Sequence, residues 1–412
     1  MAGMPTFGFG LLLAVWVVFS LGLLGWLLWR QGANADTWSY LPLLLLVGAV
    51  IGFVSPALCK EEGLPIRGYG VMLLAGVLAG TGLTVWRGRR RGLSADLVFS
   101  MVFWMFVPGI LGARVFYVIE YWPSFQGPTL WATFTQIINI AEGGIVVYGS
   151  LIGAALGLAG FVYLHRLPFL AVCDLITPGM LLGLALGRVG CLLNGCCFGG
   201  PCELPWAVTF PQGSPPYESQ LARGQFYGFR LSGNPNTEPI VLSVAPGSPA
   251  AKAGLNAGDR LTSISGYRID STGHAQSVLV QLYFEKEPLL LETAEGRTAR
   301  LEAIAVRPRS LPVHPTQAYS SLNALLLLMF LLAWEPFQRR DGILFALLLT
   351  FYPINRFLLE IIRTDESSIF GTGLSISQNV SLLLLVGVAG LWFYVLRQKK
   401  GSRTFLLVER GE

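Results

Sequence analysis

Long apolar stretches, each bounded by polar or charged residues, recur along most of the chain. Each is close to the ~20 residues that an α-helix needs to cross the hydrocarbon core of a bilayer. The first is similar to the apolar part of a signal peptide, but it is longer, and Arg30 and Gln31 follow it instead of a small-residue cleavage site. The pattern predicts nine membrane-spanning helices, at about residues 8–29, 40–57, 69–87, 98–119, 144–164, 170–193, 317–334, 342–362 and 378–397.

The pattern changes between the sixth and seventh of these spans. Residues 203–312 are rich in proline, glycine and charged residues. Apolar and polar residues alternate at 240–244 and 261–265, as is typical of strands, and residues 274–284 read as a helix. We therefore expect a soluble α+β domain inserted into an otherwise all-α polytopic membrane protein.

Composition and charge agree with this picture. Hydrophobic residues make up 53% of the chain and charged residues only 13%, and the mean hydropathy is +0.57. Basic residues near span ends stay in the cytoplasm, and here they fall on one side if the spans alternate: Arg30 and residues 87–92, 165–166, 338–340 and 397–403. This predicts an external N-terminus, a cytoplasmic C-terminus and an external position for residues 194–316. The basic residues at the span ends account for the net charge of +5. This charge is therefore no sign of nucleic-acid binding, which is not expected.

Charged residues within or beside the spans are candidates for function, because a charge inside a bilayer costs ~3 kcal/mol or more. Arg356 and Glu360 are four residues apart, and Glu360 and Arg363 are three apart, so the three share one helix face. The open alternative is an ion-pair ladder that only holds the helices together. Arg188 has no acidic neighbour in its own span, which favours an anionic partner from elsewhere. The full set is Arg114, Glu120, Glu142, Arg188, Arg356, Glu360 and Arg363.

Four of the six cysteines follow Arg188 in the pattern C-x4-C-C-x4-C, at 191, 196, 197 and 202. The spacing differs from the C-x2-C pairs of common zinc sites, and adjacent cysteines are unusual ligands for one metal. On the outer face, disulfides would persist. Disulfides are the first expectation, small buried side chains the second, and a metal or redox site the last of the three alternatives, so no metal or cofactor is assigned.

An ordered set of motifs extends over residues 66–398. The motifs are GYGVML (68–73), LGARVFYVIEY (111–121), GGIVVYGSLIG (143–153), GRVGCLLNG (187–195), LPWAVTFP (204–211), HPTQAY (314–319), NRFLLEIIR (355–363) and LSISQ (374–378). In this order and spacing, the set resembles the prolipoprotein diacylglyceryl transferase family. The resemblance implies a seven-helix core in two parts, 66–200 and 312–400, with residues 1–65 as two additional N-terminal helices.

The resemblance implies an enzyme of the bacterial inner membrane that needs no cofactor. Such enzymes move the diacylglyceryl group of phosphatidylglycerol to the thiol of a lipobox cysteine in a prolipoprotein, forming a thioether and releasing glycerol phosphate. Because the nucleophile belongs to the substrate, the enzyme must hold a phosphodiester, help the thiol lose its proton and stabilise the departing phosphate.

Arginine suits the phosphate, because its planar fork donates two parallel hydrogen bonds. We expect Arg188 and Arg356 to hold the phosphate, and Glu360 to orient Arg356 or accept the thiol proton. Tyr69 matches a functional tyrosine of the family, although a tyrosine there is equally an interfacial anchor. The motifs add further candidates for substrate contact: Asn194, Arg114, Arg363, His314 and Gln378.

The chain departs from the common family pattern at several positions. Tyr148, kept as a catalytic candidate, stands where a histidine is usual, and Ser150 replaces a glycine. Cys191 and Cys196 stand where asparagine and glutamate are usual. His314, next to Pro315, is expected to be structural first and a base second. The identity of the base therefore stays open.

The inserted segment resembles a PDZ domain over residues 224–308, through YGFRL (227–231) and AGLNAGDRL (253–261). In that family, the turn before the strand offers backbone N–H groups to the C-terminal carboxylate of a peptide, which then adds a strand to the sheet. The resemblance implies a peptide or protein partner bound at Gly228, Phe229, Arg230, Leu231 and His274. The open alternative is a packing module that binds nothing, with His274 an ordinary surface histidine.

Other classes of membrane protein fit less well. A zinc-dependent intramembrane protease would need H-E-x-x-H on a helix, which the chain lacks, and GSLIG (149–153) fails the spacing of a G-x-S-x-G serine site. The alternatives that remain are a scaffold that presents the inserted domain, and a relative that binds prolipoproteins without modifying them.

Overall fold

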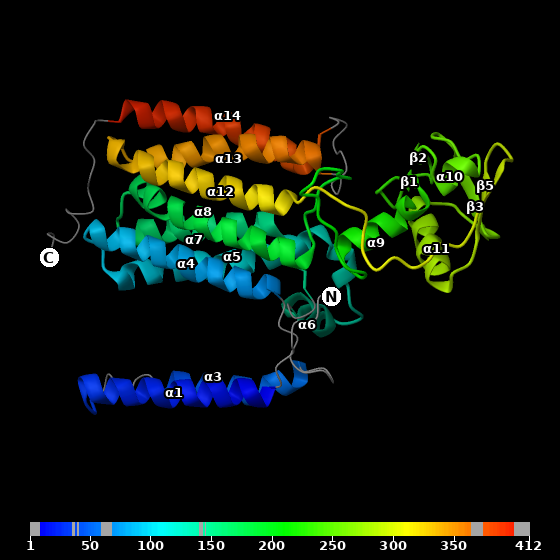
Figure 1. Ribbon diagram of the computed structural model, residues 1–412. Helices are drawn as coiled ribbons and strands as arrows, with labels where there is room; N and C mark the ends of the chain where they lie inside the picture. Colours follow the sequence, from blue (N-terminus) through cyan, green and yellow to red (C-terminus); the bar gives the residue numbers. More distant parts are fainter. Residues whose placement is uncertain are drawn as a thin grey trace. The chain divides into compact units, whose positions relative to one another are not determined.

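The computed structural model in Figure 1 describes residues 9–34, 38, 41–58, 68–139, 143–144, 146–363 and 374–398. The chain divides into two units. One comprises Met1–Val71, Leu193–Cys196 and Thr209–Leu311, and the other comprises Met72–Leu192, Cys197–Val208 and Pro312–Glu412.

Among the described residues, eight helices are long and apolar enough to cross a membrane. The ninth expected span corresponds to α3 (Leu41–Leu58), whose side chains are described only in part, so the count of nine stays a prediction. The polytopic helical class is confirmed. Besides α1 (Phe9–Gln31), the helices of this kind are α4 (Gly68–Arg90), α5 (Ala95–Glu120), α7 (Val147–Leu164), α8 (Phe169–Asn194), α12 (Thr316–Trp334), α13 (Ile343–Ile362) and α14 (Ile376–Arg397).

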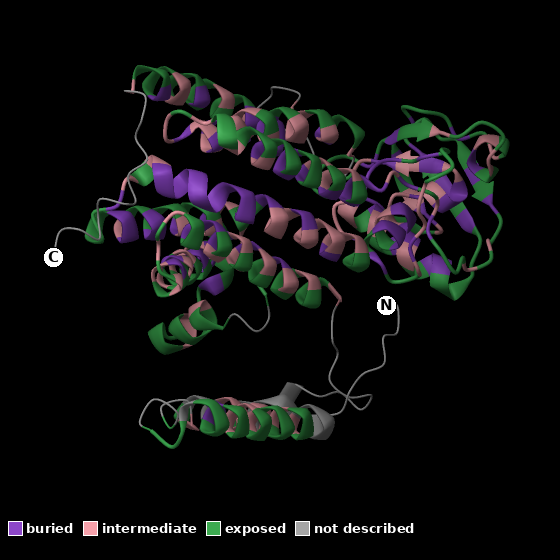
Figure 2. Ribbon diagram, turned by 60° about the vertical axis from the view of Figure 1, so that its left-hand side comes forward, coloured by how far each residue is buried: buried purple, intermediate pink, exposed green. Residues whose placement is uncertain are grey.

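Helix α8 is the buried helix of the bundle. Its residues 171–179 are all buried, and they form the long purple stretch in Figure 2. In Figure 1, α4, α5, α7, α12 and α13 run beside it. This central position explains why α8 is apolar around its whole circumference instead of along one stripe.

Glycines allow α5 and α7 to pack closely. Gly149, Gly153 and Gly157 are spaced by four residues, so they lie on one face of α7. A Cβ at Gly157 would clash with the carbonyl oxygen of Trp104, and one at Gly153 with that of Pro108. Small residues at this spacing bring helix backbones together in membranes, where packing replaces the hydrophobic effect as the driving force.

A buried polar network ties α4, α8 and α13 together at the other end of the bundle from Arg356. Arg87 is 2% exposed and forms an ion pair of 2.9 Å with Glu335. Asp174 accepts hydrogen bonds from the backbone N–H groups of Gly342 (2.6 Å) and Phe345 (2.8 Å), so it caps α13. Arg87 therefore has a structural role that the basic run at 87–92 did not predict.

The segment between α8 and α12 contains an α+β domain, as expected. Two antiparallel strands, β1 (Phe229–Leu231) and β2 (Val241–Val244), form one sheet. A second antiparallel sheet has the order β4-β3-β5-β6. The remaining elements are β3 (Leu261–Ile264), β4 (Tyr267–Arg268), β5 (Leu289–Thr293), β6 (Thr298–Leu301), α9 (Pro215–Ala222), α10 (Pro249–Lys252) and α11 (Thr272–Glu285). The expected strands at 240–244 and 261–265 and the helix at 274–284 are confirmed.

The domain has its own hydrophobic core, which includes α9. Tyr217 of α9 is fully buried. Its hydroxyl donates to the carbonyl of Arg307 and lies 3.1 Å from the Tyr283 hydroxyl in α11. Burial also raises the pKa of the nearby Tyr227 phenol to about 12. The core therefore extends from α9, ahead of the PDZ-like motifs, to the end of the segment.

One short helix was not expected. Helix α6 (Leu130–Ile138) lies between α5 and α7, and it has no buried residue. Leu130, Trp131 and Phe134 are exposed on it. A segment of nine residues is too short to span a membrane, so the search for long apolar runs passed over it.

Candidate active site

Two arginines and a glutamate form a buried ion-pair cluster at the end of α13. Arg356 lies 2.5 Å from Glu360, and Arg363 lies 3.5 Å from the same carboxylate oxygen. The side chains are 15%, 3% and 6% exposed for Arg356, Glu360 and Arg363. Arg356 also donates to the hydroxyl of Ser377 on α14 (2.7 Å). The predicted shared helix face is confirmed for Arg356 and Glu360, whereas Arg363 lies just past the end of α13 and reaches Glu360 from there.

A cavity of about 290 Å³ lies beside Arg356, between α12 and α13. Polar groups line part of it, and the Asn355 amide donates to Asn323 across it (2.9 Å). Its remaining wall is apolar, so the cavity suits a ligand with a polar head and hydrocarbon parts. The lining residues are Tyr319, Ser320, Asn323, Tyr352, Asn355, Arg356, Leu358, Leu359 and Ile362.

Arg188 reaches this site from α8 through Tyr352. Its guanidinium donates a hydrogen bond to the Tyr352 phenol, which also lines the cavity. Tyr352, Arg356 and Glu360 are spaced by four residues and therefore share one face of α13. Tyr352 was not among the residues predicted from the sequence, although its spacing of four residues from Arg356 is a signal for it. The structure thus brings Arg188, Arg356 and Glu360 to one region.

Two further candidates lie close to this region. His314 lies 3.4 Å from the hydroxyl of Tyr319, which lines the cavity. The side chain of Gln378 accepts from the backbone N–H of Ser375 (3.0 Å) in a capping box at the start of α14, next to Ser377. His314 and Gln378 thus support the groups around the cavity.

The other membrane candidates lie on other helices. Tyr69 is in the first turn of α4 and is 39% exposed. Tyr148 is in the first turn of α7, and Asn194 is the last residue of α8. Among the residues that the structure describes, Tyr69, Tyr148, Asn194 and Arg114 are not part of the cavity wall.

Arg114 has a distinct environment on α5. Its guanidinium is 8% exposed and donates to five backbone carbonyls that follow α5, at 2.7–3.0 Å: those of Gln136, Ile137, Asn139, Gly143 and Gly144. An arginine that satisfies so many carbonyls organises the chain around it. Glu142 lies outside the described residues.

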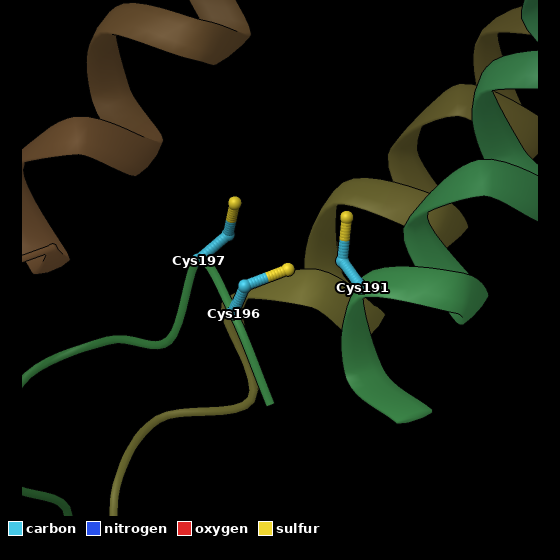
Figure 3. Close-up of side chains that lie close together, drawn as sticks. All are labelled: Cys191, Cys196 and Cys197. Carbon is cyan, nitrogen blue, oxygen red and sulfur yellow. The ribbon is translucent and has the colours of Figure 1, made fainter. Parts of the chain in front are cut away.

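Three cysteines meet where α8 ends. The sulfur atoms of Cys191, Cys196 and Cys197 all lie within 4.8 Å of one another. Figure 3 shows the Cys196 side chain pointing toward Cys191, with Cys197 from the next position beside them. The structure records all three as thiols, together with the buried Cys202. Arg188 lies within electrostatic reach of Cys191 and Cys197.

The outer edge of β1 is already hydrogen-bonded within the domain. The N–H of Leu231 donates to the carbonyl of Arg223 (3.0 Å), and that of Phe229 donates to Gly224 (3.4 Å). His274 at the start of α11 lies 3.3 Å from Asp270. Hydrogen bonds from Ser271 and then His274 hold the pKa of the exposed Asp270 carboxyl below its usual range.

Comparisons with known proteins agree on one family. The family model described as prolipoprotein diacylglyceryl transferase matches residues 56–394. The chain is 34% identical to the phosphatidylglycerol–prolipoprotein diacylglyceryl transferase of Rhodopirellula baltica, over 93% of this chain and 85% of that protein. It is 25% identical to transferase 2 of Clostridium perfringens, over 83% of this chain and 94% of that protein. It is 35% identical to the Synechocystis enzyme, over 38% of this chain and 53% of that protein.

Proposed function

The chain belongs to the prolipoprotein diacylglyceryl transferase family, and we propose that it moves the diacylglyceryl group of phosphatidylglycerol to the lipobox cysteine of prolipoproteins. Its relatives in Rhodopirellula and Clostridium are named for this activity. The observation that carries the proposal is that Arg188 of α8 lies at Tyr352, which lines a cavity with polar and apolar walls together with Arg356 of α13.

The two arginines would hold the phosphate of phosphatidylglycerol. Each guanidinium presents a planar fork that matches two phosphate oxygens and keeps its charge when poorly solvated. When the carbon–oxygen bond breaks, the departing glycerol phosphate gains negative charge, and fixed cations stabilise that charge best where water is scarce. The apolar wall formed by Leu358, Leu359 and Ile362 suits the hydrocarbon part of the lipid.

Glu360 would act on Arg356, not on the substrate. Its carboxylate already pairs with Arg356 at 2.5 Å and with Arg363 at 3.5 Å. These contacts and the bond to Ser377 fix the Arg356 guanidinium in one orientation, which is what a preorganised phosphate site requires. Arg363 would leave the cluster with a net positive charge, which suits an anionic phosphate, and Gln378 would hold Ser377 in place by capping α14.

The remaining candidates have supporting roles in this proposal. Tyr69 and Asn194 would bind the lipid headgroup or the peptide at the membrane boundary, and Tyr148 would face the substrate from the start of α7. His314 would position Tyr319 at the cavity. Arg114 would hold in place the five carbonyls that it contacts ahead of α7.

The soluble domain is proposed to be PDZ-like and to lie outside the cytoplasm of a bacterial inner membrane, with the C-terminus inside. It would bind an extended stretch of the prolipoprotein or of a partner protein, with Arg230 and His274 beside the groove. Because Arg223 and Gly224 already accept from the β1 edge, a peptide could add there only by displacing them. Binding would therefore be weaker than at an open edge.

The test is transfer by the full-length protein in phosphatidylglycerol-containing vesicles, with a lipobox peptide as acceptor. Arg188→Ala and Arg356→Ala should each abolish thioether formation. Arg300→Ala, at an exposed position in the soluble domain, is the matched control and should keep it. A scaffold or a non-modifying relative would give no product in any of these proteins.

A further inference from the structure

The three-thiol cluster at the end of α8 has the geometry of a metal site. Its sulfur atoms lie within 4.8 Å of one another, and a tetrahedral zinc with Zn–S bonds of about 2.3 Å sets its sulfurs about 3.8 Å apart. Modest rotations of the three side chains would bring the sulfurs to that spacing. Soft thiolate ligands select zinc or copper(I) over harder cations.

The backbone explains how two adjacent cysteines can face the same point. In an extended chain, neighbouring side chains point to opposite sides. Helix α8 ends at Asn194, Gly195 turns the chain with φ +77°, and Cys197 has φ +58°. This left-handed conformation is uncommon for a residue other than glycine and breaks the alternation. Cys196 therefore points toward Cys191, as Figure 3 shows, and the Cys197 sulfur stays within 4.8 Å of both.

The surroundings suit a negatively charged metal centre. Arg188 precedes Cys191 by three residues on α8, so it places a positive charge near the cluster. Three thiolates around Zn²⁺ carry a net charge of −1, which Arg188 would offset. Three protein ligands also leave the fourth position of a tetrahedral zinc open, as in catalytic zinc sites.

We propose that Cys191, Cys196 and Cys197 bind one Zn²⁺ ion, and that the sulfur of the lipobox cysteine becomes its fourth ligand. The inference rests on the proposed transferase function, and it names the group that helps the substrate thiol lose its proton. Glu360 is engaged by two arginines, so another group must help the substrate thiol lose its proton. Coordination to zinc does so, because a coordinating thiol is deprotonated outright.

The transfer step then balances without an oxidant or a reductant. The substrate thiol releases its proton to solvent as it binds zinc. An electron pair of the bound sulfur forms the new bond to the glyceryl carbon, while the carbon–oxygen bond to the phosphate breaks. Glycerol phosphate leaves with that electron pair beside Arg188 and Arg356. The neutral thioether is a weaker ligand than the thiolate, so the product is released.

Metal content provides the first test. The full-length protein is purified in detergent with reductant, loaded with Zn²⁺, desalted and analysed by mass spectrometry for zinc. We expect one equivalent in the wild type and in Cys202→Ser, a control outside the cluster, and a loss of bound zinc in Cys191→Ser and Cys196→Ser. Equal zinc content in all four proteins would overturn the proposal. So would a disulfide within the cluster of protein isolated without reductant.

A second test needs no variant and reports on the substrate directly. The zinc is replaced by Co²⁺, whose absorption spectrum depends on its ligands, and a lipobox peptide is added. The cysteine peptide should change the spectrum, and a peptide with serine in its place should not. Identical spectra with both peptides would contradict coordination of the substrate sulfur.

Activity separates this inference from the proposed function. Removing zinc with a chelator should lower the transfer rate by about 100-fold or more, and adding Zn²⁺ should restore it. Full transfer by the metal-free protein would overturn the zinc site and leave the transferase function intact. Zinc bound by the cluster of a protein that transfers nothing would support the metal site and contradict the transferase function.

Discussion

Tyr352 links Arg188 to the face of α13 that carries Arg356. It accepts a hydrogen bond from Arg188 of α8, and it precedes Arg356 by one helical turn on α13. Sequence reasoning identified both arginines because charges are expensive inside a membrane. It could not identify Tyr352, because a tyrosine in an apolar helix carries no such cost, and its partner becomes visible only once α8 and α13 are placed side by side.

Replacing Tyr352 with phenylalanine tests this connection. The change keeps the ring and removes the hydrogen bond, so Arg188 would be held less well. We expect kcat/KM for the lipobox peptide to fall roughly tenfold, equivalent to about 1.4 kcal/mol, with KM for phosphatidylglycerol rising if Arg188 binds the phosphate. Tyr163→Phe, at a position on α7 that is 84% exposed, should leave both constants unchanged. Equal effects of the two changes would contradict the role of Tyr352.

Among the helices, the length of the apolar stretches predicts the eight described membrane spans well. Helix packing is harder to predict from the sequence, because the faces by which helices touch depend on small residues and buried polar groups. Arg87 shows why: it reads as one of several basic residues at a span end, yet it is buried against Glu335, which is 248 positions away in the chain. Such long-range pairs follow from the arrangement of helices, which apolar length does not determine.

Two glycine substitutions on α7 test how closely α5 and α7 pack. Gly157→Ala would push a methyl group against the Trp104 carbonyl, and overpacking of this kind costs about 1–3 kcal/mol. We expect a lower midpoint in thermal unfolding of the detergent-solubilised protein. Gly160→Ala should change it little, because its nearest neighbour is a Trp104 ring carbon at 3.6 Å. A larger effect at Gly160 would contradict the packing described here.

At the scale of the whole molecule, the soluble domain begins and ends at neighbouring points. The N–H of Gln212 donates to the carbonyl of Pro308 at 3.1 Å. The motifs placed the PDZ-like segment at 224–308, whereas α9 adds Tyr217 to the same core. Sequence motifs mark the turns that a family shares. They carry no information on a flanking helix that completes the core.

A deletion variant tests whether the domain acts on the substrate. In this variant a short Gly/Ser linker replaces the residues between Gln212 and Pro308. The cut includes α9 and so leaves no part of the domain core exposed. We expect transfer to a short lipobox peptide to be retained and transfer to a full-length prolipoprotein to be reduced, because only the long substrate could contact the domain. Equal rates on the full-length substrate with and without the domain would exclude substrate capture.

The transfer reaction itself tests the central claim most directly. The full-length protein is mixed with phosphatidylglycerol vesicles and a lipobox peptide, and the peptide is analysed by mass spectrometry. We predict a peptide that has gained a diacylglyceryl group on its cysteine, with release of glycerol phosphate and no product from Arg188→Ala or Arg356→Ala. An unmodified peptide from the wild-type protein, or a product that forms equally well without the two arginines, would contradict the account.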